Sequence, residues 1–240
     1  MTGAAILVAL TSLAGPAFAQ DISINFGQGA GLTERVIQLI ALITVLSLAP
    51  SILVMMTSFT RIVVVLSLLR TALGTGTAPP NAVIVALALF LTAFVMGPAF
   101  QNAYENGLRP LVNNEITTEQ AFERASGPFK TFMLKNVREK DLALFLDLSR
   151  EARPATPEDV SLRILIPAFM ISELKRAFEI GFLLFLPFLI IDLVVASVLM
   201  SMGMMMLPPV VVSLPFKLIF FVLVDGWTLV AGSLIQSYGP

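Results

Sequence analysis

The sequence predicts an all-α membrane protein made of proline-kinked helical hairpins, with about four hydrophobic segments and a small helical domain outside the cytoplasm. Of the 240 residues, 57% are hydrophobic and only 13% are charged, whereas soluble domains carry about 25% charged residues. Several apolar runs approach or exceed the roughly 20 residues that cross a bilayer. Prolines lie inside these runs, where they bend a helix because they remove a backbone hydrogen bond.

Composition also excludes several classes of function. The formal net charge is −1, and no basic patch is present that would hold phosphates, so we expect no nucleic-acid partner. Cysteine and histidine are absent, which excludes disulfides, cysteine-based metal sites and imidazole acid–base chemistry. The enzyme-like motif Ser172-x-x-Lys175 lacks the S-D-N and K-T-G elements that accompany it in penicillin-binding enzymes. We therefore expect no catalysis, no cofactor and no metal site.

Residues 1–19 are predicted to be a cleaved signal peptide. The apolar run Ala4–Leu13 is too short to span a bilayer, and Ala17-Phe18-Ala19 has the A-x-A form of a signal-peptidase site. No Lys or Arg precedes the apolar run, and the alternative is a poorly ordered apolar tail. Cleavage would leave a mature chain that begins near Gln20 on the outer side of the membrane.

Residues 20–100 are predicted to form a polar lead-in and the first membrane hairpin. Val36–Phe59 is long enough to cross a membrane and should kink at Pro50. Apolar character continues beyond it, which is too long for one straight span. The segment therefore either bends, or its second part, Thr60–Leu73, lies outside the hydrocarbon.

The return segment of that hairpin is predicted at Val83–Met96, ended by Gly97-Pro98. It is short for a span and would need tilt, neighbouring helices or a locally thinner bilayer. The connection before it carries Arg61 and Arg70 and no acidic residue. Because loops rich in Lys and Arg stay in the cytoplasm, we expect this connection on the cytoplasmic side.

Residues 101–163 carry most of the charges, with both signs mixed, and are predicted to form an amphipathic helical domain in the periplasm. Thr117 and Gln120 have the spacing of a capping box. We expect two or three helices, followed by a strong helix start at Thr156–Asp159, where a cap, a proline and two acids follow one another. The apolar side chains that recur at helical spacings are Phe122, Phe129, Phe132, Phe145 and Leu146.

Residues 164–240 are predicted to form the second membrane hairpin. The first arm should bend at Pro167 and Pro187. A methionine-rich turn, Leu199–Pro209, reverses the chain, and Val210–Val224 forms the return arm. The apex of the hairpin is thus expected at a sharp break between two apolar runs.

The turn at that apex is unusually rich in methionine. The thioether is unbranched, flexible and polarizable, which suits a surface that must fit varied shapes. We interpret the cluster as such a surface, and the alternative is that the methionines fill gaps in a helix core. Five of the 11 methionines lie within seven consecutive residues: Met200, Met202, Met204, Met205 and Met206.

Two charges lie inside apolar runs of this hairpin, Asp192 and Lys217. A charge at that depth costs about 2.5–3.5 kcal/mol on insertion scales and needs a partner or a wet cavity. Each lies about twelve residues from the centre of the turn, so both are placed roughly 18 Å from the tip of an antiparallel hairpin. We expect them to face each other or to pair between copies of the chain. The alternative is that prolines offset the register and Lys217 reaches an interface.

Four charged residues crowd the entry to the second hairpin. Glu173 with Arg176, and Lys175 with Glu179, have the spacing of helix neighbours. The two interpretations are surface pairs at a membrane boundary and a contact between subunits.

Three blocks of sequence carry a family resemblance. They are TSFTR followed by APPN (residues 57–81), PAFMISELKRAFEIGF (167–182), and LMSMGMMMLPP followed by SLPFK (199–217). In this order they resemble the FliP family of flagellar biosynthesis proteins and its virulence type III secretion relatives, the SctR proteins. The resemblance runs from about residue 36 to residue 227 and is weakest across 101–155. The signal peptide favours the flagellar branch, because the virulence relatives usually lack one.

The resemblance implies a core component of the flagellar type III protein export gate, in the inner membrane at the flagellar basal body. Family members form a ring, thought pentameric, that assembles with FliQ and FliR, with FlhB and FlhA attached below. Unfolded export substrates cross through the central pore. The family's helices lie partly above the bilayer plane, which accounts for short and proline-broken segments because protein neighbours satisfy their backbone.

The resemblance also assigns roles to particular residues. The pore gasket would be formed by Met204, Met205 and Met206, with Met202 beside them. Buried charges that match the family's subunit-packing charges are Glu173, Asp192 and Lys217. Residues that match its self-association face are Phe132 and Phe145.

Three other interpretations stay open. A virulence type III gate subunit would share the same blocks. A solute transporter or ion channel is disfavoured by the short chain, the few polar residues within the apolar runs and the lack of an inverted repeat. An intramembrane enzyme is disfavoured because the catalytic motifs are missing.

Overall fold

In a computed structural model, the chain is described over residues 54–149, 154–204 and 206–239, together with isolated positions between 36 and 52. The described residues form helices and turns and contain no strand, which confirms the predicted all-α class. The predicted signal peptide, the polar lead-in and Pro50 lie outside the described residues.

The chain divides into two units, Met1–Ser47 and Leu48–Pro240. In the first unit the described positions from Val36 onward are helical, and the hydroxyls of Thr44 and Ser47 donate to carbonyls one turn back. The helices of the second unit, in chain order, are α3 (Phe59–Leu73), α4 (Asn81–Ala103), the π-helical turn η1 (Tyr104–Leu108), α5 (Arg109–Val112), α6 (Thr118–Asn136), α7 (Glu139–Ser149), the 3₁₀ turn η2 (Pro157–Asp159), α8 (Leu162–Ser201), α9 (Pro209–Leu223) and α10 (Gly226–Gln236).

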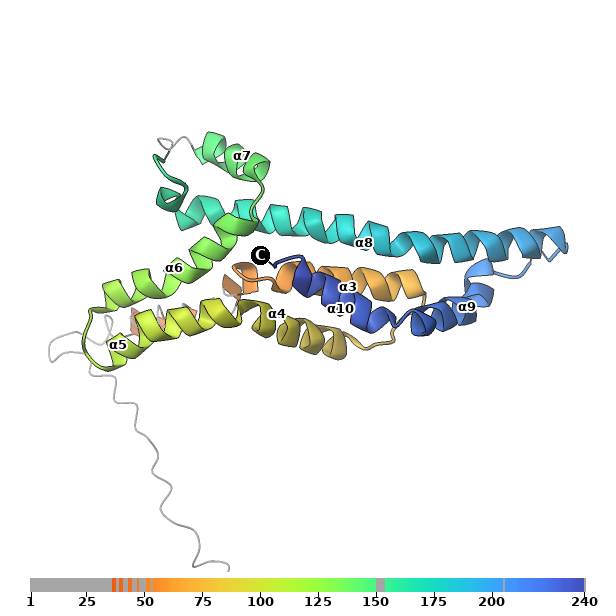
Figure 1. The fold of residues 1–240 in the computed structure, drawn as a ribbon, viewed down its shortest axis with the longest axis horizontal. Helices are drawn as coiled ribbons and strands as arrows, with labels where there is room; N and C mark the ends of the chain where they lie inside the picture. The colour runs from red at the N-terminus through yellow and green to blue at the C-terminus, as the bar shows by residue number, and fades with distance from the viewer. Residues whose placement is uncertain are drawn as a thin grey trace, which may run out of the picture. The chain divides into compact units, whose positions relative to one another are not determined.

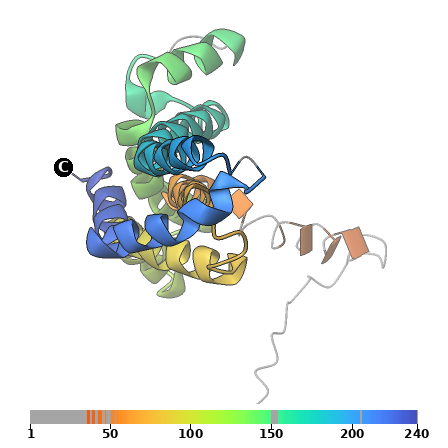
Figure 2. The ribbon, with the colours of Figure 1, turned by 90° about the vertical axis from the view of Figure 1, so that its right-hand side faces the viewer.

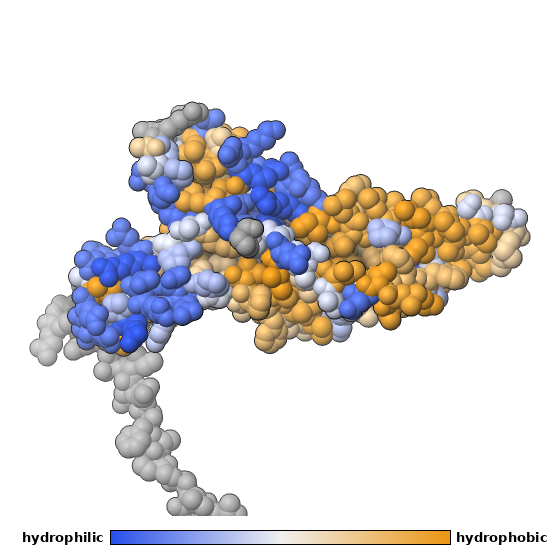
Figure 3. All heavy atoms as spheres, viewed as in Figure 1, coloured by the Kyte–Doolittle hydropathy of each residue, from blue (hydrophilic) through white to orange (hydrophobic). Residues whose placement is uncertain are grey.

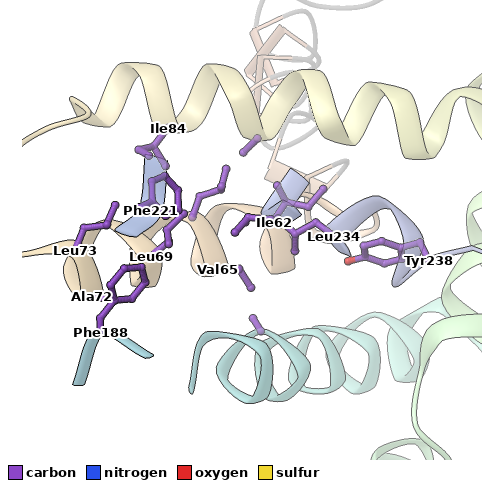
Figure 4. Close-up of a cluster of buried hydrophobic side chains, with 14 residues drawn as sticks. Ile62, Val65, Leu69, Ala72, Leu73, Ile84, Phe188, Phe221, Leu234 and Tyr238 are labelled. Carbon is purple, nitrogen blue, oxygen red and sulfur yellow. The ribbon is translucent and has the colours of Figure 1, made fainter. Parts of the chain in front are cut away.

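The helix at the centre of the second unit is α3. Helices α8, α4 and α9 contact it, and the end-on view of Figure 2 shows it enclosed by α8, α4 and the α9–α10 pair. Val65 of α3 is fully buried, and Figure 4 shows the cluster that it joins. Other helices contribute Ile84 (α4), Phe188 (α8), Phe221 (α9) and Leu234 (α10) to this core.

The two ends of the α3–α4 connection agree with the sequence. Helix α3 ends at Gly74, which adopts the left-handed conformation with φ 76° and donates its N–H to the carbonyl of Thr71. Glycine is favoured there because it has no Cβ to clash in that conformation. Helix α4 begins at Asn81, directly after Pro80.

The predicted end of the next segment at Gly97-Pro98 is wrong, because α4 continues to Ala103 and into η1. A proline inside a helix removes one hydrogen bond and costs about 3 kcal/mol. Met96 and Ala103, on either side of Pro98, are both buried in a cluster that includes Phe129 of α6 and Phe169 of α8. This packing on both sides holds the helix together through the proline.

Residues 101–163 contain two longer amphipathic helices, α6 and α7, together with the end of α4, the short elements η1, α5 and η2, and the start of α8. The capping box before α6 is present: the Thr117 N–H donates to Gln120 Oε1 and the Gln120 N–H donates to Thr117 Oγ1, each at 3.3 Å. The predicted division of the chain between residues 100 and 101 lies inside α4. Phe129 and Met133 of α6 belong to the cluster that holds Met96 of α4, so these helices share a core.

The predicted helix start at Thr156–Asp159 gives only the 3₁₀ turn η2. The Asp159 carboxylate accepts from the Thr156 N–H at 3.3 Å and from the Thr156 hydroxyl at 2.9 Å. The turn then breaks at Val160, which is extended with ψ 129° and buried in the second core. Burial of this side chain redirects the backbone, and α8 starts two residues later at Leu162.

Two helical runs are long and apolar enough to cross a membrane among the described residues: Asn81–Val112, with 32 residues, and α8, with 40. Helix α8 continues through Pro167 and Pro187 as a single helix. Helices α9 and α10 form a third candidate that is bent by 63° at Asp225, where φ is 50°. Figure 3 shows apolar surface over the adjoining halves of α8 and α9 and hydrophilic surface over α5 and α6.

Close packing of η1 on α6 gives a first prediction. A Cβ added to Gly107 would lie 2.7 Å from the Cβ of Ala125 and 3.0 Å from its backbone N and Cα. Gly107→Ala should therefore lower the unfolding free energy by about 1–3 kcal/mol, measured by denaturant unfolding in detergent. Gly97→Ala is the matched control, because a Cβ at that helix position meets nothing within 4 Å and should be neutral or stabilising. Equal stability of the two variants would contradict the packing described.

Candidate functional site

The methionine-rich turn closes the hairpin of α8 and α9. Helix α8 ends in a Schellman motif, in which the Met204 N–H donates to the Leu199 carbonyl at 3.0 Å and the Gly203 N–H to the Met200 carbonyl at 3.1 Å. Gly203 has φ 72°, a conformation that glycine adopts without strain. Gly203 therefore ends the helix and starts the turn.

The methionines of this turn point away from the core of the chain. Met205 lies outside the described residues. The other four side chains are exposed, and by contrast Met96 and Met133 in the second core are fully buried. The alternative that the cluster fills gaps in a helix core is therefore wrong for these four. Their exposed fractions are 58% for Met200, 66% for Met202, 40% for Met204 and 97% for Met206.

An ion pair joins the arms of the hairpin below this tip. Lys217 Nζ of α9 lies 2.7 Å from Asp192 Oδ2 of α8, so the two predicted charges face each other within one chain. The Ser213 hydroxyl donates to the other oxygen of Asp192. The side chains are 4% exposed for Lys217 and 22% for Asp192. The register of the hairpin is thus fixed by a charge pair with an additional hydrogen bond, as a buried pair requires.

Lys217 also contacts the end of α3. Its ammonium donates to the Ala72 carbonyl at 3.1 Å, and a Cβ on Gly74 would lie 3.8 Å from Nζ. The last carbonyls of a helix lack intrahelical partners and carry partial negative charge, so a cation there is favourable. Lys217 therefore neutralises Asp192 and caps α3 at once.

A second buried network holds the opposite end of α3. Arg61, 1% exposed, donates from Nη2 to Glu173 Oε1 of α8 at 2.5 Å, and Glu173 is fully buried. The Tyr238 hydroxyl donates to Glu173 Oε2. Arg61 Nη1 donates to the Ser237 hydroxyl at 2.9 Å, and its guanidinium lies 3.8 Å from the Tyr238 ring centroid. Three segments distant in sequence thus meet at one pair of charges.

This network corrects two expectations. Arg61 was expected in a cytoplasmic connection, but it lies inside α3 and is buried. Glu173 was expected to pair with Arg176 along its own helix, yet its partners come from α3 and from the residues after α10. Glu173 does not pair with Arg176 because Glu173 is fully buried, and a carboxylate shielded from solvent needs a cation that is equally buried. The companion pair, Lys175 and Glu179, is present at 4.0 Å on the surface.

The two phenylalanines predicted for self-association are half-buried within the chain. Phe132 of α6 stacks on Tyr238 with ring centroids 5.6 Å apart and meets Phe169 edge-on at 5.9 Å. Phe145 of α7 packs against the second core. Their role between subunits stays a prediction, and so does that of Glu173, Asp192 and Lys217.

A third polar group ties α7 to α8. Arg138 Nε and Nη2 donate to the two oxygens of Asp141 at 2.8 and 2.9 Å, and the Ser172 hydroxyl donates to Asp141 Oδ2 at 2.6 Å. The hydrogen bonds from Arg138, and secondarily from Ser172, hold the pKa of Asp141 below its usual value even though burial opposes them. Ser172 therefore serves a structural contact, in line with the view that its S-x-x-K spacing with Lys175 is chance.

Sequence reasoning missed Tyr238, Ser213 and the Ala72 carbonyl as partners of the buried charges. Tyr238 is 65 residues from Glu173 and Lys217 is 145 from Ala72, so no periodicity links them. The available signal was Arg61 itself, a cation set in an apolar run that needs a partner.

A model of the FliP family matches residues 42–234 of this chain. The chain belongs to the FliP family. The matched range contains all three sequence blocks that suggested the resemblance, and it contains both arms of the hairpin with the methionine tip.

Relatives of this FliP-family chain are similar over most of their length. It is 63% identical over 241 residues to the flagellar biosynthetic protein FliP of Caulobacter vibrioides, which covers 98% of this chain and 91% of that protein. It is 56% identical over 202 residues to the protein of that name from Bacillus subtilis, with 84% and 91% covered. For the Rhizobium meliloti protein of that name, the values are 48% over 240 residues, with 98% of each chain covered.

The ion pair of the hairpin predicts a loss of stability on removal of one charge. Lys217→Met should lower the unfolding free energy by up to about 3 kcal/mol, because Asp192 then lies in an apolar environment without its cation. The double variant Asp192→Asn with Lys217→Met should regain part of that loss. Lys175→Met removes an exposed helix pair and should cost at most about 0.5 kcal/mol. Additive single losses in the double-mutant cycle would contradict the pairing.

Tyr238 gives a prediction with a control elsewhere in the chain. Tyr238→Phe keeps the ring but leaves Glu173 Oε2 without its donor, which should cost about 1–3 kcal/mol. Tyr238→Leu should cost more, because the contacts with Arg61 and Phe132 are lost as well. The chain's other tyrosine, Tyr104, is exposed, and Tyr104→Phe should be neutral. Thermal unfolding in detergent measures all three, and a neutral Tyr238→Phe would rule out the hydrogen bond as a stabilising contact.

Proposed function

We propose that this FliP-family chain is a pore-forming subunit of the flagellar type III protein export gate, which passes unfolded flagellar subunits across the inner membrane. In this proposal several copies, expected to be five, form a ring in the flagellar basal body. FliQ, FliR, FlhB and FlhA are the proposed partners. Family membership and the shared name of the relatives support the flagellar assignment.

The observation that carries the proposal is the exposed methionine tip on a hairpin of fixed register. A conduit for many sequences has no use for side-chain specificity, and it needs a lining that closes against ions yet deforms around any chain. Flexible thioethers meet both needs. Met202, Met204 and Met206 are exposed at the tip, and with Met205 they form the proposed gasket.

The arms of the hairpin support assembly into a ring. Phe182 on α8 and Val222 on α9 are 64% and 75% exposed although both are apolar. An apolar groove of about 490 Å³ lies between the two helices, lined by residues such as Val194, Val198 and Phe216. Large apolar surfaces of this kind mark contacts with lipid or with other subunits. We propose that neighbouring copies and lipid cover them, with Phe132 and Phe145 in the self-association face.

The proposed topology follows the sequence. Residues 1–19 direct the chain to the membrane and are removed, and the mature N-terminus lies outside. Residues 101–163 stand on the periplasmic side, and the connection before α4 faces the cytoplasm. The two long apolar runs and the bent α9–α10 pair have the length and composition that membrane insertion requires.

The gasket is tested in cells that lack the chromosomal copy, which should be non-motile and should not secrete hook subunits. The parent chain should restore both. Replacement of Met204, Met205 and Met206 by Ala should raise membrane ion conductance, because alanine leaves space that water and ions can enter, while export persists or falls modestly.

Two controls make this measurement specific. Met55 is exposed and lies far from the tip in sequence, so Met55→Ala should leave conductance unchanged. Replacement of the three tip methionines by Leu keeps apolar volume and should retain closure. Unchanged conductance in the triple alanine variant would remove the gasket proposal, and full motility of the deletion strain would remove the export role.

A further inference from the structure

The methionine side chains of this chain differ widely in exposure, and exposure governs how readily a thioether is oxidised. There is no cysteine, so every sulfur atom belongs to one of 11 methionines. Met96 and Met133 are fully buried and Met56 is 6% exposed, whereas the four described methionines of the tip are 40–97% exposed; outside the tip, Met55 is 42% exposed. Among the methionines that the structure describes, Met206 has the most exposed side chain, at 97%.

The backbone conformation of the turn leaves these thioethers exposed to solvent. The Schellman motif satisfies the last carbonyls of α8 through the N–H groups of Gly203 and Met204, so the turn does not depend on side-chain packing. Pro208 and Pro209 then start α9 immediately.

We propose that the α8–α9 tip is a site of reversible methionine oxidation, and that its oxidation opens the gate. A sulfur lone pair of the thioether attacks one oxygen of a hydrogen peroxide molecule. The O–O bond breaks as the S–O bond forms, and the sulfur is oxidised by two electrons to the sulfoxide. The proton of the attacked oxygen passes to the departing hydroxide, which leaves as water. A sulfoxide reductase with two thiols reverses the step and yields the thioether, a disulfide and water.

The consequence for the gate rests on the proposed function. A closed constriction of thioethers excludes water because it is apolar, which is how hydrophobic gates block ions. A sulfoxide is polar and accepts hydrogen bonds from water, so an oxidised ring would hydrate and conduct. Oxidation of the tip thus couples peroxide stress to loss of the ion barrier.

The modification itself is tested in native membranes that contain the assembled full-length chain. The membranes are treated with hydrogen peroxide for increasing times, and peptide mass spectrometry follows the addition of one oxygen to each methionine. Met202, Met204 and Met206 should oxidise, as should the exposed Met55, while Met96 and Met133 of the same molecules stay intact. Subsequent treatment with a sulfoxide reductase should restore the tip. Oxidation of the tip no faster than that of the buried methionines would overturn the site.

The functional consequence is tested separately by ion conductance of the same membranes. Peroxide should raise the conductance of the parent chain, and the reductase should lower it again. The variant with Leu at positions 202, 204, 205 and 206 is the matched control, because it keeps the apolar tip but has no oxidisable sulfur there. Its conductance should not respond to peroxide.

These outcomes separate the two proposals. Tip oxidation without a change in parent conductance would overturn the switch, although the gasket could still be supported by the alanine variant. A rise in conductance in the leucine variant equal to that of the parent would assign the leak to another site. If the alanine variant leaves conductance unchanged but the tip still oxidises selectively, the gasket fails and the modification site stands.

Discussion

The structure depends on the clamping of α3 to α8 by two charge pairs. At one end Arg61 meets Glu173, and at the other the Ala72 carbonyl accepts from Lys217, which is paired with Asp192. Both carboxylates come from α8, so one long helix supplies the fixed points for the whole unit. Between them one face of α3 is buried in an apolar core, and most of its other side chains are half-buried. Burial of a charge is tolerated because each one has an opposite charge and further hydrogen bonds.

This arrangement explains how an apolar hairpin can hold a defined tip. The arms of α8 and α9 expose large apolar side chains and have few specific contacts beyond Asp192 and Lys217. A purely apolar contact is permissive about register, whereas an ion pair at 2.7 Å is not. The exposed methionines of the tip, Met202, Met204 and Met206, are thus carried on arms of defined register. In the proposed gasket, flexible thioethers would supply the deformable lining and the ion-paired arms its fixed support.

Local features of the fold were predictable from the sequence and nonlocal ones were not. The end of the α3 segment at Leu73 and the capping box at Thr117 depend on a few neighbouring residues, and both were predicted. The facing of Asp192 and Lys217 followed from their equal spacing about the turn. The pairing of Arg61 with Glu173 could not be predicted in this way, because the two residues are 112 positions apart and no helical period connects them. The continuation of α4 through Gly97-Pro98 could not be predicted either, because it depends on packing against α6, which follows later in the chain.

The central claim, that α3 is held in one register along α8, is tested most directly by a cross-link. The chain has no cysteine, so any introduced pair is unique. A Cβ on Gly181 would lie 3.2 Å from the Cβ of Leu68, close to the separation of about 3.8 Å typical of a disulfide. The variant with Leu68→Cys and Gly181→Cys should form an intrachain disulfide on mild oxidation. No cross-link in that variant, with efficient cross-linking when Ser67→Cys replaces Leu68→Cys, would contradict the register and the account built on it.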